Sequence, residues 1–138
     1  MADPSLALQG AINVKLRADI SAVAGRVLDH VPSDVTFPYI ELGEFQIVDD
    51  GAQCHDGVEV FITLHVWSRP EAGVTPPGQV QAKTIAGAVR GSIHEAELDL
   101  GDDWQFLEIA HQDTRYLKDP DGLTSHAVLT FRALVAAA

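Results

Sequence analysis

The strongest constraint on the fold is a ten-residue alternation in the middle of the chain. Every second position holds an aliphatic residue: Val58, Val60, Ile62, Leu64 and Val66. The positions between them hold Glu59, Phe61, Thr63, His65 and Trp67. Successive side chains of a β-strand point to opposite faces. The run therefore predicts a long strand with one face in the core and the other half covered.

Two segments show the helical period instead. Leu8, Ile12, Leu16 and Ile20 recur every four residues after Asp3-Pro4, which predicts a helix over about 4–21. A second helix is predicted over about 78–95, where the apolar stripe is Ala82, Ile85, Ala86, Val89 and Ile93.

The remaining strands are shorter or less regular. We expect a short strand in 26–31, a strand over 39–48, strand-like segments over 98–100 and 104–111, and a final hairpin of 115–118 with 124–135. Asp119-Pro120-Asp121-Gly122 is the turn signal of that hairpin.

The predicted order is α-β-β-β-α-β-β-β in a single domain spanning residues 1–138. Two helices cannot cover both faces of such a sheet. We therefore predict an α+β fold, an antiparallel (mixed) β-sheet with both helices packed on one face. The other face would carry Phe61, His65, Trp67 and His126 and needs solvent or a partner.

The net charge of the chain limits the kinds of partner that it can bind. The formal net charge is −11, with nine bases that form no basic run. Specific nucleic-acid binding and binding to anionic membranes are both disfavoured. One cysteine, no membrane-length apolar window and no N-terminal signal pattern lead us to expect assembly in a reducing cytoplasm.

Catalytic and metal-binding patterns are weak. The best cluster is Cys54-His55-Asp56, but adjacent residues point apart, and the six histidines show no HxxxH or HExxH spacing. No GxSxG, P-loop or GxGxxG occurs. We expect no cofactor, no metal and no catalytic residue. The alternative is a small cytoplasmic ligand-binding or metal-dependent enzyme domain that uses His65, His111 and His126, which would need a closed pocket.

A stiff segment, residues 30–44, carries the candidate contact residues. Pro32 and Pro38 restrict the chain around Phe37 and Tyr39. Phe37, Pro38 and Tyr39, with Phe61 and Trp67 of the alternating run, are the predicted subunit or partner interface. The segment equally fits a role in which Phe37 and Tyr39 close the core of their own domain.

The loop between the strands predicted over 39–48 and 58–67 is acidic. Asp49, Asp50 and Asp56 lie in or beside it, and such loops often carry the contacts of a domain. They are our candidates for loop contacts.

Four stretches resemble, in order, the small tail-completion proteins of long-tailed phages and gene transfer agents, also called tail terminators or head–tail joining proteins. They are FPYIELGE (37–44), VWSR (66–69), AKTIAGAVRGSI (82–93) and RYLKDPDGLTSHAVLTFRALV (115–135). The likeness covers nearly the whole chain, and its motifs are structural rather than catalytic.

The resemblance implies a structural virion protein without enzymatic activity. It implies a homo-hexameric ring at the neck-proximal end of the virion tail, assembled in the host bacterial cytoplasm. Such a ring caps the tail tube, stops its polymerisation and joins it to a neck or stopper protein. DNA passes through it without specific binding, and Asp49, Asp50 and Asp56 are the candidates for the channel lining. A generic oligomeric adaptor remains a third possibility.

Overall fold

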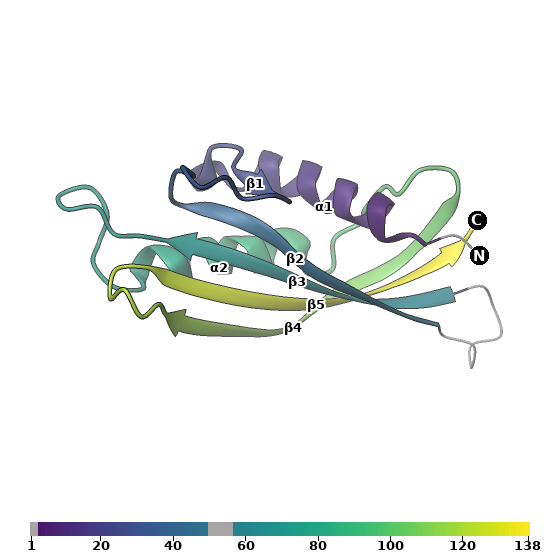
Figure 1. The fold of residues 1–138 in the computed structure, drawn as a ribbon. Coiled ribbons are helices and arrows are strands. Elements are labelled where there is room, and N and C mark those ends of the chain that lie inside the picture. Colours follow the sequence, from purple (N-terminus) through teal and green to yellow (C-terminus); the bar gives the residue numbers. More distant parts are fainter. Residues whose placement is uncertain (1–2, 50–56) are drawn as a thin grey trace.

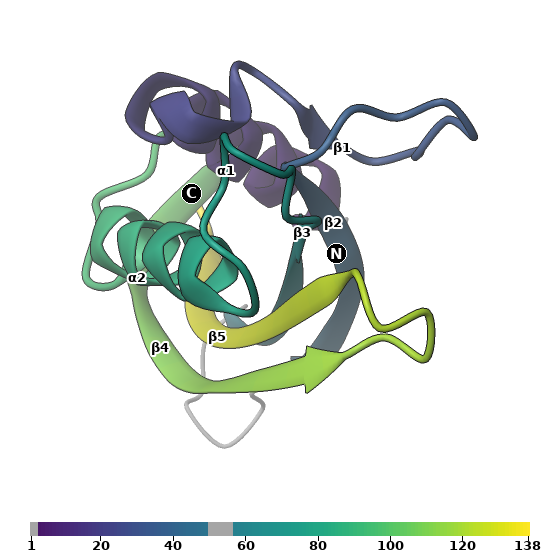
Figure 2. The same ribbon diagram turned by 90° about the vertical axis from the view of Figure 1, so that its left-hand side faces the viewer.

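The computed structural model describes residues 3–49 and 57–138. They form a curved five-stranded sheet with two helices on its concave side (Figures 1 and 2). The element order is α1 (Ser5–Asp19), the short helix η1 (Ser21–Val23), β1 (Val27–Leu28), β2 (Tyr39–Asp49), β3 (Gly57–Ser68), α2 (Val80–Ile93), β4 (Trp104–Lys118) and β5 (Ser125–Ala137). The predicted α+β class is confirmed.

The strand order across the sheet is β1-β2-β3-β5-β4. β1 pairs with β2 in parallel, and every other pairing is antiparallel. β3 and β5 form the centre of the sheet, and their twelve-residue pairing from Gly57 to Ser68 is unbroken. The predicted alternation of β3 is therefore confirmed, since every second side chain of this strand is buried.

The core lies between the sheet and the two helices. Leu8, Ile12 and Leu16 of α1 are fully buried, as are Val89 and Ile93 of α2. From the sheet, the aliphatic face of β3 and Leu129, Phe131 and Val135 of β5 meet them. The stripes predicted for both helices are thus the ones that are buried.

The chain after α2 differs from the prediction. Residues 98–100 do not pair as a strand, and the segments predicted over 104–111 and 115–118 form one strand, β4. Two strands therefore follow α2, where the predicted order has three. We call residues 95–103 the strap. Leu98 and Leu100 of the strap are buried in the core, and the Glu95 amide donates to the Ile109 carbonyl. The strap is therefore held by the burial of these two leucines and not by strand pairing.

The start of α1 and the end of β5 lie at the same end of the sheet, and the β4–β5 turn lies at the other end (Figure 1). The final amide, of Ala138, donates to the Asp103 carbonyl at the end of the strap. Within the described residues, no helix is both long and apolar enough to cross a bilayer.

Candidate contact surface on the open face of the sheet

A row of rings crosses the open face of the sheet. Phe37 and Tyr39 have ring centroids 5.2 Å apart, and Tyr39 stacks with Trp67 of β3. The Trp67 ring lies almost parallel to His126 of β5, with centroids 3.7 Å apart. His65 completes the row against His126. We call these five residues the aromatic row.

Strand register explains why the row forms. Tyr39 of β2 and His126 of β5 are both direct cross-strand neighbours of Trp67. Such neighbours on one face have Cβ atoms about 5 Å apart. Three adjacent strands therefore supply one continuous stack.

Polar contacts fix the orientation of the row. The Trp67 indole N–H donates to the Glu41 Oε1 atom at 2.9 Å. The His65 Nδ1 and His126 Nε2 atoms share a hydrogen bond of 2.7 Å. Burial, followed by the neighbouring His65, lowers the pKa of His126. The neutral form of the His126 imidazole is therefore favoured in the folded protein.

A glycine makes room for His65. A Cβ atom on Gly43 would lie 2.7 Å from the His65 Nε2 atom and 2.7 Å from the Thr63 carbonyl oxygen. Gly43 sits where the β2–β3 register shifts, between Leu42 and Phe45. The imidazole therefore occupies the space that any side chain at position 43 would fill.

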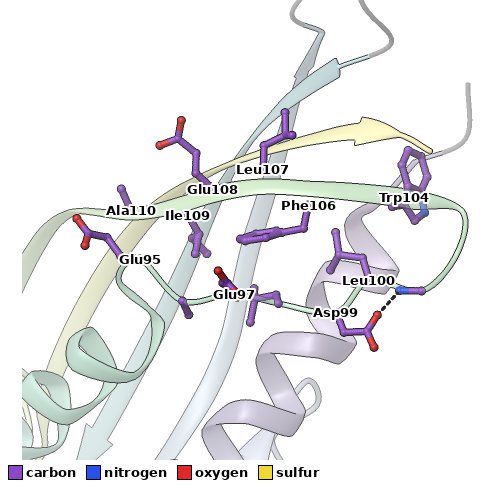
Figure 3. Close-up of a pocket in the computed structure, with 13 residues that line it drawn as sticks. Glu95, Glu97, Asp99, Leu100, Trp104, Phe106, Leu107, Glu108, Ile109 and Ala110 are labelled. Atoms are coloured by element: carbon purple, nitrogen blue, oxygen red, sulfur yellow. Dashed lines mark hydrogen bonds between the residues drawn. The ribbon is translucent and has the colours of Figure 1, made fainter.

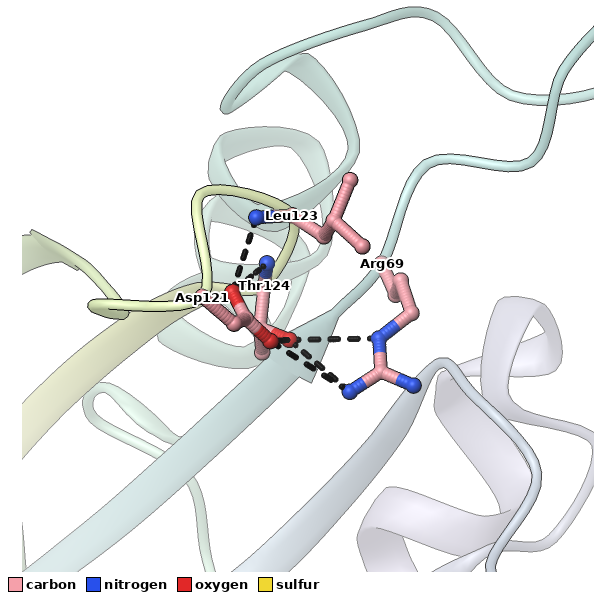
Figure 4. A network of polar contacts seen from close by, with 4 residues as sticks. All are labelled: Arg69, Asp121, Leu123 and Thr124. Carbon is pink, nitrogen blue, oxygen red and sulfur yellow. Dashed lines mark hydrogen bonds and ion pairs between the residues drawn. The ribbon is translucent and has the colours of Figure 1, made fainter.

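An arginine ties the row to the β4–β5 turn (Figure 4). The Arg69 guanidinium lies over the Phe37 ring, 4.4 Å from its centroid. Its Nε and Nη2 atoms donate to the Thr124 hydroxyl at 3.2 and 3.1 Å, and Nη2 lies 3.5 Å from the Asp121 carboxylate. Arg69 thereby connects the 30–44 segment to the final hairpin.

Asp121 organises the turn itself. Its carboxylate accepts from the Leu123 and Thr124 amides and from the Thr124 hydroxyl. These bonds, led by that from the hydroxyl, lower the pKa of Asp121 to about 2. The turn predicted at 119–122 is confirmed, and its acid acts as a structural acceptor.

A hollow of about 500 Å³ lies between the strap and the first half of β4 (Figure 3). Leu98, Leu100, Phe106 and Ile109 contribute apolar surface to it, and Glu95, Glu97 and Asp99 stand on the strap beside it. None of its thirteen lining residues is a histidine, cysteine, serine, lysine or arginine. The strand histidines therefore lie elsewhere.

Those histidines do not converge. His65 and His126 lie on the open face, whereas His111 faces the helices, with its ring against Phe131 and near Arg90. Among the described residues, no three side chains of the metal-binding types come together. The geometry that the enzyme alternative required is not present in this part of the chain.

Comparison with known proteins identifies the chain. The family model described as "Tail completion protein gp17" matches residues 10–136. The chain belongs to this family. It is therefore a structural protein of tail assembly, and the resemblance read from the sequence is confirmed.

A solved structure supports the fold of this tail-completion chain independently. A chain of the "Virion of native gene transfer agent (GTA) particle" superposes with a TM-score of 0.82 at 24% identity, and the match covers 99% of both chains. At this identity the superposition shows that the fold is shared. Comparison with curated protein sequences gives no match.

The predicted interface residues of this family member lie in two places. Phe37, Tyr39 and Trp67 come together in the aromatic row, with Pro38 between the first two. Phe61 lies six residues from Trp67 on β3, about 20 Å along the strand. Tyr39 is only 7% exposed, so its ring packs within its own domain, while the other four are half-buried.

The acidic candidates are only partly described. Asp49 is exposed at the end of β2. Asp50 and Asp56 lie outside the described residues, as do Cys54 and His55. Arg69, Glu41 and Gly43 are structural partners that sequence reasoning missed. Only Gly43 gave a signal, as a glycine inside a strand.

Proposed function

We propose that the chain forms a homo-hexameric ring that caps the tail tube, stops its growth and joins it to a neck protein. The observation that carries the proposal is the family match over residues 10–136. The gene transfer agent chain that shares the fold supports a place in the virion tail of a phage or such an agent. The ring would form in the host cytoplasm and sit at the neck-proximal end.

A ring also suits the surfaces. Copies related by rotation meet through two different patches, one on each subunit. The open face offers half-buried aromatic side chains, and aromatic residues are enriched at interface centres. We propose that Phe37, Pro38, Phe61 and Trp67 contact a neighbouring subunit or a tail partner, with Tyr39 supporting Trp67 from beneath.

The ring itself can be tested on the wild-type protein. Native mass spectrometry at high protein concentration should show six copies. Negative-stain electron microscopy should show the protein at one end of tail tubes from the same particle. Particles that remain single copies, in solution and with tubes, would contradict the proposal.

The contact residues can be tested with Phe37→Ser and Phe61→Ser together. Thermal denaturation should show a folded protein, and native mass spectrometry with tube binding should show loss of assembly by about tenfold or more. Leu6→Ser is the matched control, because Leu6 is 78% exposed on α1, which lies on the other side of the sheet. Normal assembly and capping by the double variant would remove these residues from the interface.

The acidity has a proposed role as well. A channel lined by Asp49, Asp50 and Asp56 would repel DNA phosphates and keep the path from binding DNA. Replacing Asp50 and Asp56 by lysine should leave capping unchanged and slow DNA release, more strongly at low salt. Release at the wild-type rate would place these acids away from the DNA path.

A further inference from the structure

Both edges of the sheet carry strand segments whose outer sides are open. On β4, residues 113–118 follow the second bulge and pair with β5 without interruption. On β2, Phe45–Asp49 pair regularly with β3, whereas β1 covers only Ile40 and Glu41. Among the described residues, no strand pairs with the outer side of either run. Such edges are templates for another strand.

The two open edges run in opposite directions. β2, β3, β5 and β4 are adjacent and successively antiparallel. β2 is therefore antiparallel to β4. When one copy is rotated onto the next about a ring axis, its β2 arrives antiparallel to the neighbour's β4, so the sheet can continue from copy to copy.

Charge distinguishes the two edges. Arg115 and Lys118 of β4 are exposed and make no ion pair or side-chain hydrogen bond with the described residues. Glu44 and Asp49 of β2 are exposed in the same way. Asp113 is the one acid of the 113–118 run. Pairing β4 with β4 would bring cations together, while pairing β4 with β2 brings opposite charges together.

Apolar side chains accompany the charges. Tyr116 and Leu117 of β4 are 37% and 44% exposed, and Val48 of β2 is 38% exposed. Lys83 of α2 stands over the Tyr116 ring at 5.3 Å, which adds a cation to the β4 side. Each edge therefore offers apolar contact together with a charge of one dominant sign.

Edge pairing requires neighbouring copies to be shifted along their strands, and the tilt of strands in a closed ring supplies a shift of the right size. Through the registers, Thr114 of β4 is level with Leu42 of β2, so unshifted copies would place 113–118 against the part of β2 that β1 covers. A closed sheet needs tilted strands. Four strands about 4.8 Å apart and tilted by about 45° shift by about 19 Å, or five to six residues. A shift of this size toward Asp49 brings 113–118 opposite Phe45–Asp49.

We propose that neighbouring subunits join by antiparallel edge pairing, residues 113–118 of β4 of one copy against residues 45–49 of β2 of the next. The proposal rests on the ring proposed above and names its lateral contact. Arg115 and Lys118 face the acidic edge of the neighbour and set the head-to-tail direction.

The test uses two charge-reversed full-length proteins. One carries Arg115→Glu with Lys118→Glu, and the other carries Glu44→Lys with Asp49→Lys. Each alone should need at least about tenfold more protein to reach half assembly by native mass spectrometry. An equimolar mixture should regain the wild-type mass, because alternating copies restore opposite charges. Glu95→Lys with Glu97→Lys, on the strap, matches the charge change of the second variant and should assemble normally.

Hydrogen exchange provides a second readout. Amides in 113–118 and 45–49 should exchange at least about tenfold more slowly in the wild-type ring than in the monomeric variants. If exchange in these segments is unchanged in the wild-type ring, the edge pairing is overturned. Normal assembly of both variants would overturn it as well. Neither outcome would contradict the ring proposed above. A dimer that joins two β4 edges would also overturn it. Absence of any ring, even on tail tubes, would instead overturn the proposed function.

Discussion

At the scale of single residues, position 43 is where close packing is least tolerant. The His65 imidazole and the Thr63 carbonyl both occupy the place of a Cβ atom at Gly43. The carbonyl belongs to the adjacent strand and cannot turn away as a flexible side chain could. The histidine pair and the bulge of β2 therefore depend on the absence of a side chain here.

Gly43→Ala should lower the free energy of unfolding by about 1–3 kcal/mol, because the new methyl group overlaps the neighbouring strand. Urea denaturation measures the change. Gly10→Ala is the control, since a Cβ at Gly10 of α1 meets nothing within 4 Å. That substitution should be neutral or stabilising by up to about 1 kcal/mol. Equal stability of the two variants would contradict the steric account.

Some residue contacts could not be predicted from the sequence. Phe37 and Trp67 were named as surface candidates, yet their link through Tyr39 depends on the β2–β3 register. The hydrogen bond between His65 and His126 joins residues 61 positions apart. No local pattern encodes it, since it requires knowing that β5 lies beside β3.

At the scale of elements, the final hairpin depends on its turn. Asp121 accepts three hydrogen bonds within the turn and lies beside Arg69. The pKa of its carboxyl in the folded protein, about 2, lies below the ordinary value of 3.8. Its contribution to stability is therefore complete above about pH 4 and is lost as pH falls through 2.

Asp121→Asn should lower the midpoint of thermal unfolding at neutral pH, because the charged acceptor is lost. The difference from wild type should shrink as pH falls from about 4 to 2, where the wild-type carboxylate also takes up a proton. Thermal scans across this pH range measure it. Asp29→Asn, at an exposed acid, should show little difference at any pH. A gap that stays constant to pH 2 would contradict the role of the charge.

Elements with a strong period could be predicted, and the others could not. The stripe of α1 and the alternation of β3 follow directly from burial on one side. The sequence predicts two strands where β4 is one, because the bulge between His111 and Asp113 breaks the alternation. The alternation of Leu98 and Leu100 predicts a strand in the strap, although these residues anchor a coil. The open face could be predicted because two helices are too few to cover both faces of the sheet.

At the scale of the whole molecule, one core joins both helices to the sheet. α1 contributes Leu8, Ile12 and Leu16, and α2 contributes Val89 and Ile93, to the same buried cluster as Phe131. Neither helix has a separate core of its own. We accordingly propose that residues 1–138 act as a single folding unit.

Unfolding should therefore be one cooperative transition, with far-ultraviolet circular dichroism and tryptophan fluorescence giving the same urea midpoint. The two probes report different features: circular dichroism follows the helices and strands, and fluorescence follows Trp67 on the open face and Trp104, which packs against the core. Phe131→Ala should shift both midpoints together and cost about 3–5 kcal/mol. Midpoints that separate would indicate two units.

The placement of the chain ends gives any assembly of this protein a built-in polarity. The start of α1 and the end of β5 lie at one end of the sheet, and the β4–β5 turn, which includes Leu123, lies at the other (Figure 1). In a ring of parallel copies, a gold particle or fluorophore attached at either terminus would thus decorate one rim, and a label at Leu123 the opposite rim. Under the proposed capping role, microscopy of labelled particles would show directly which rim meets the tube.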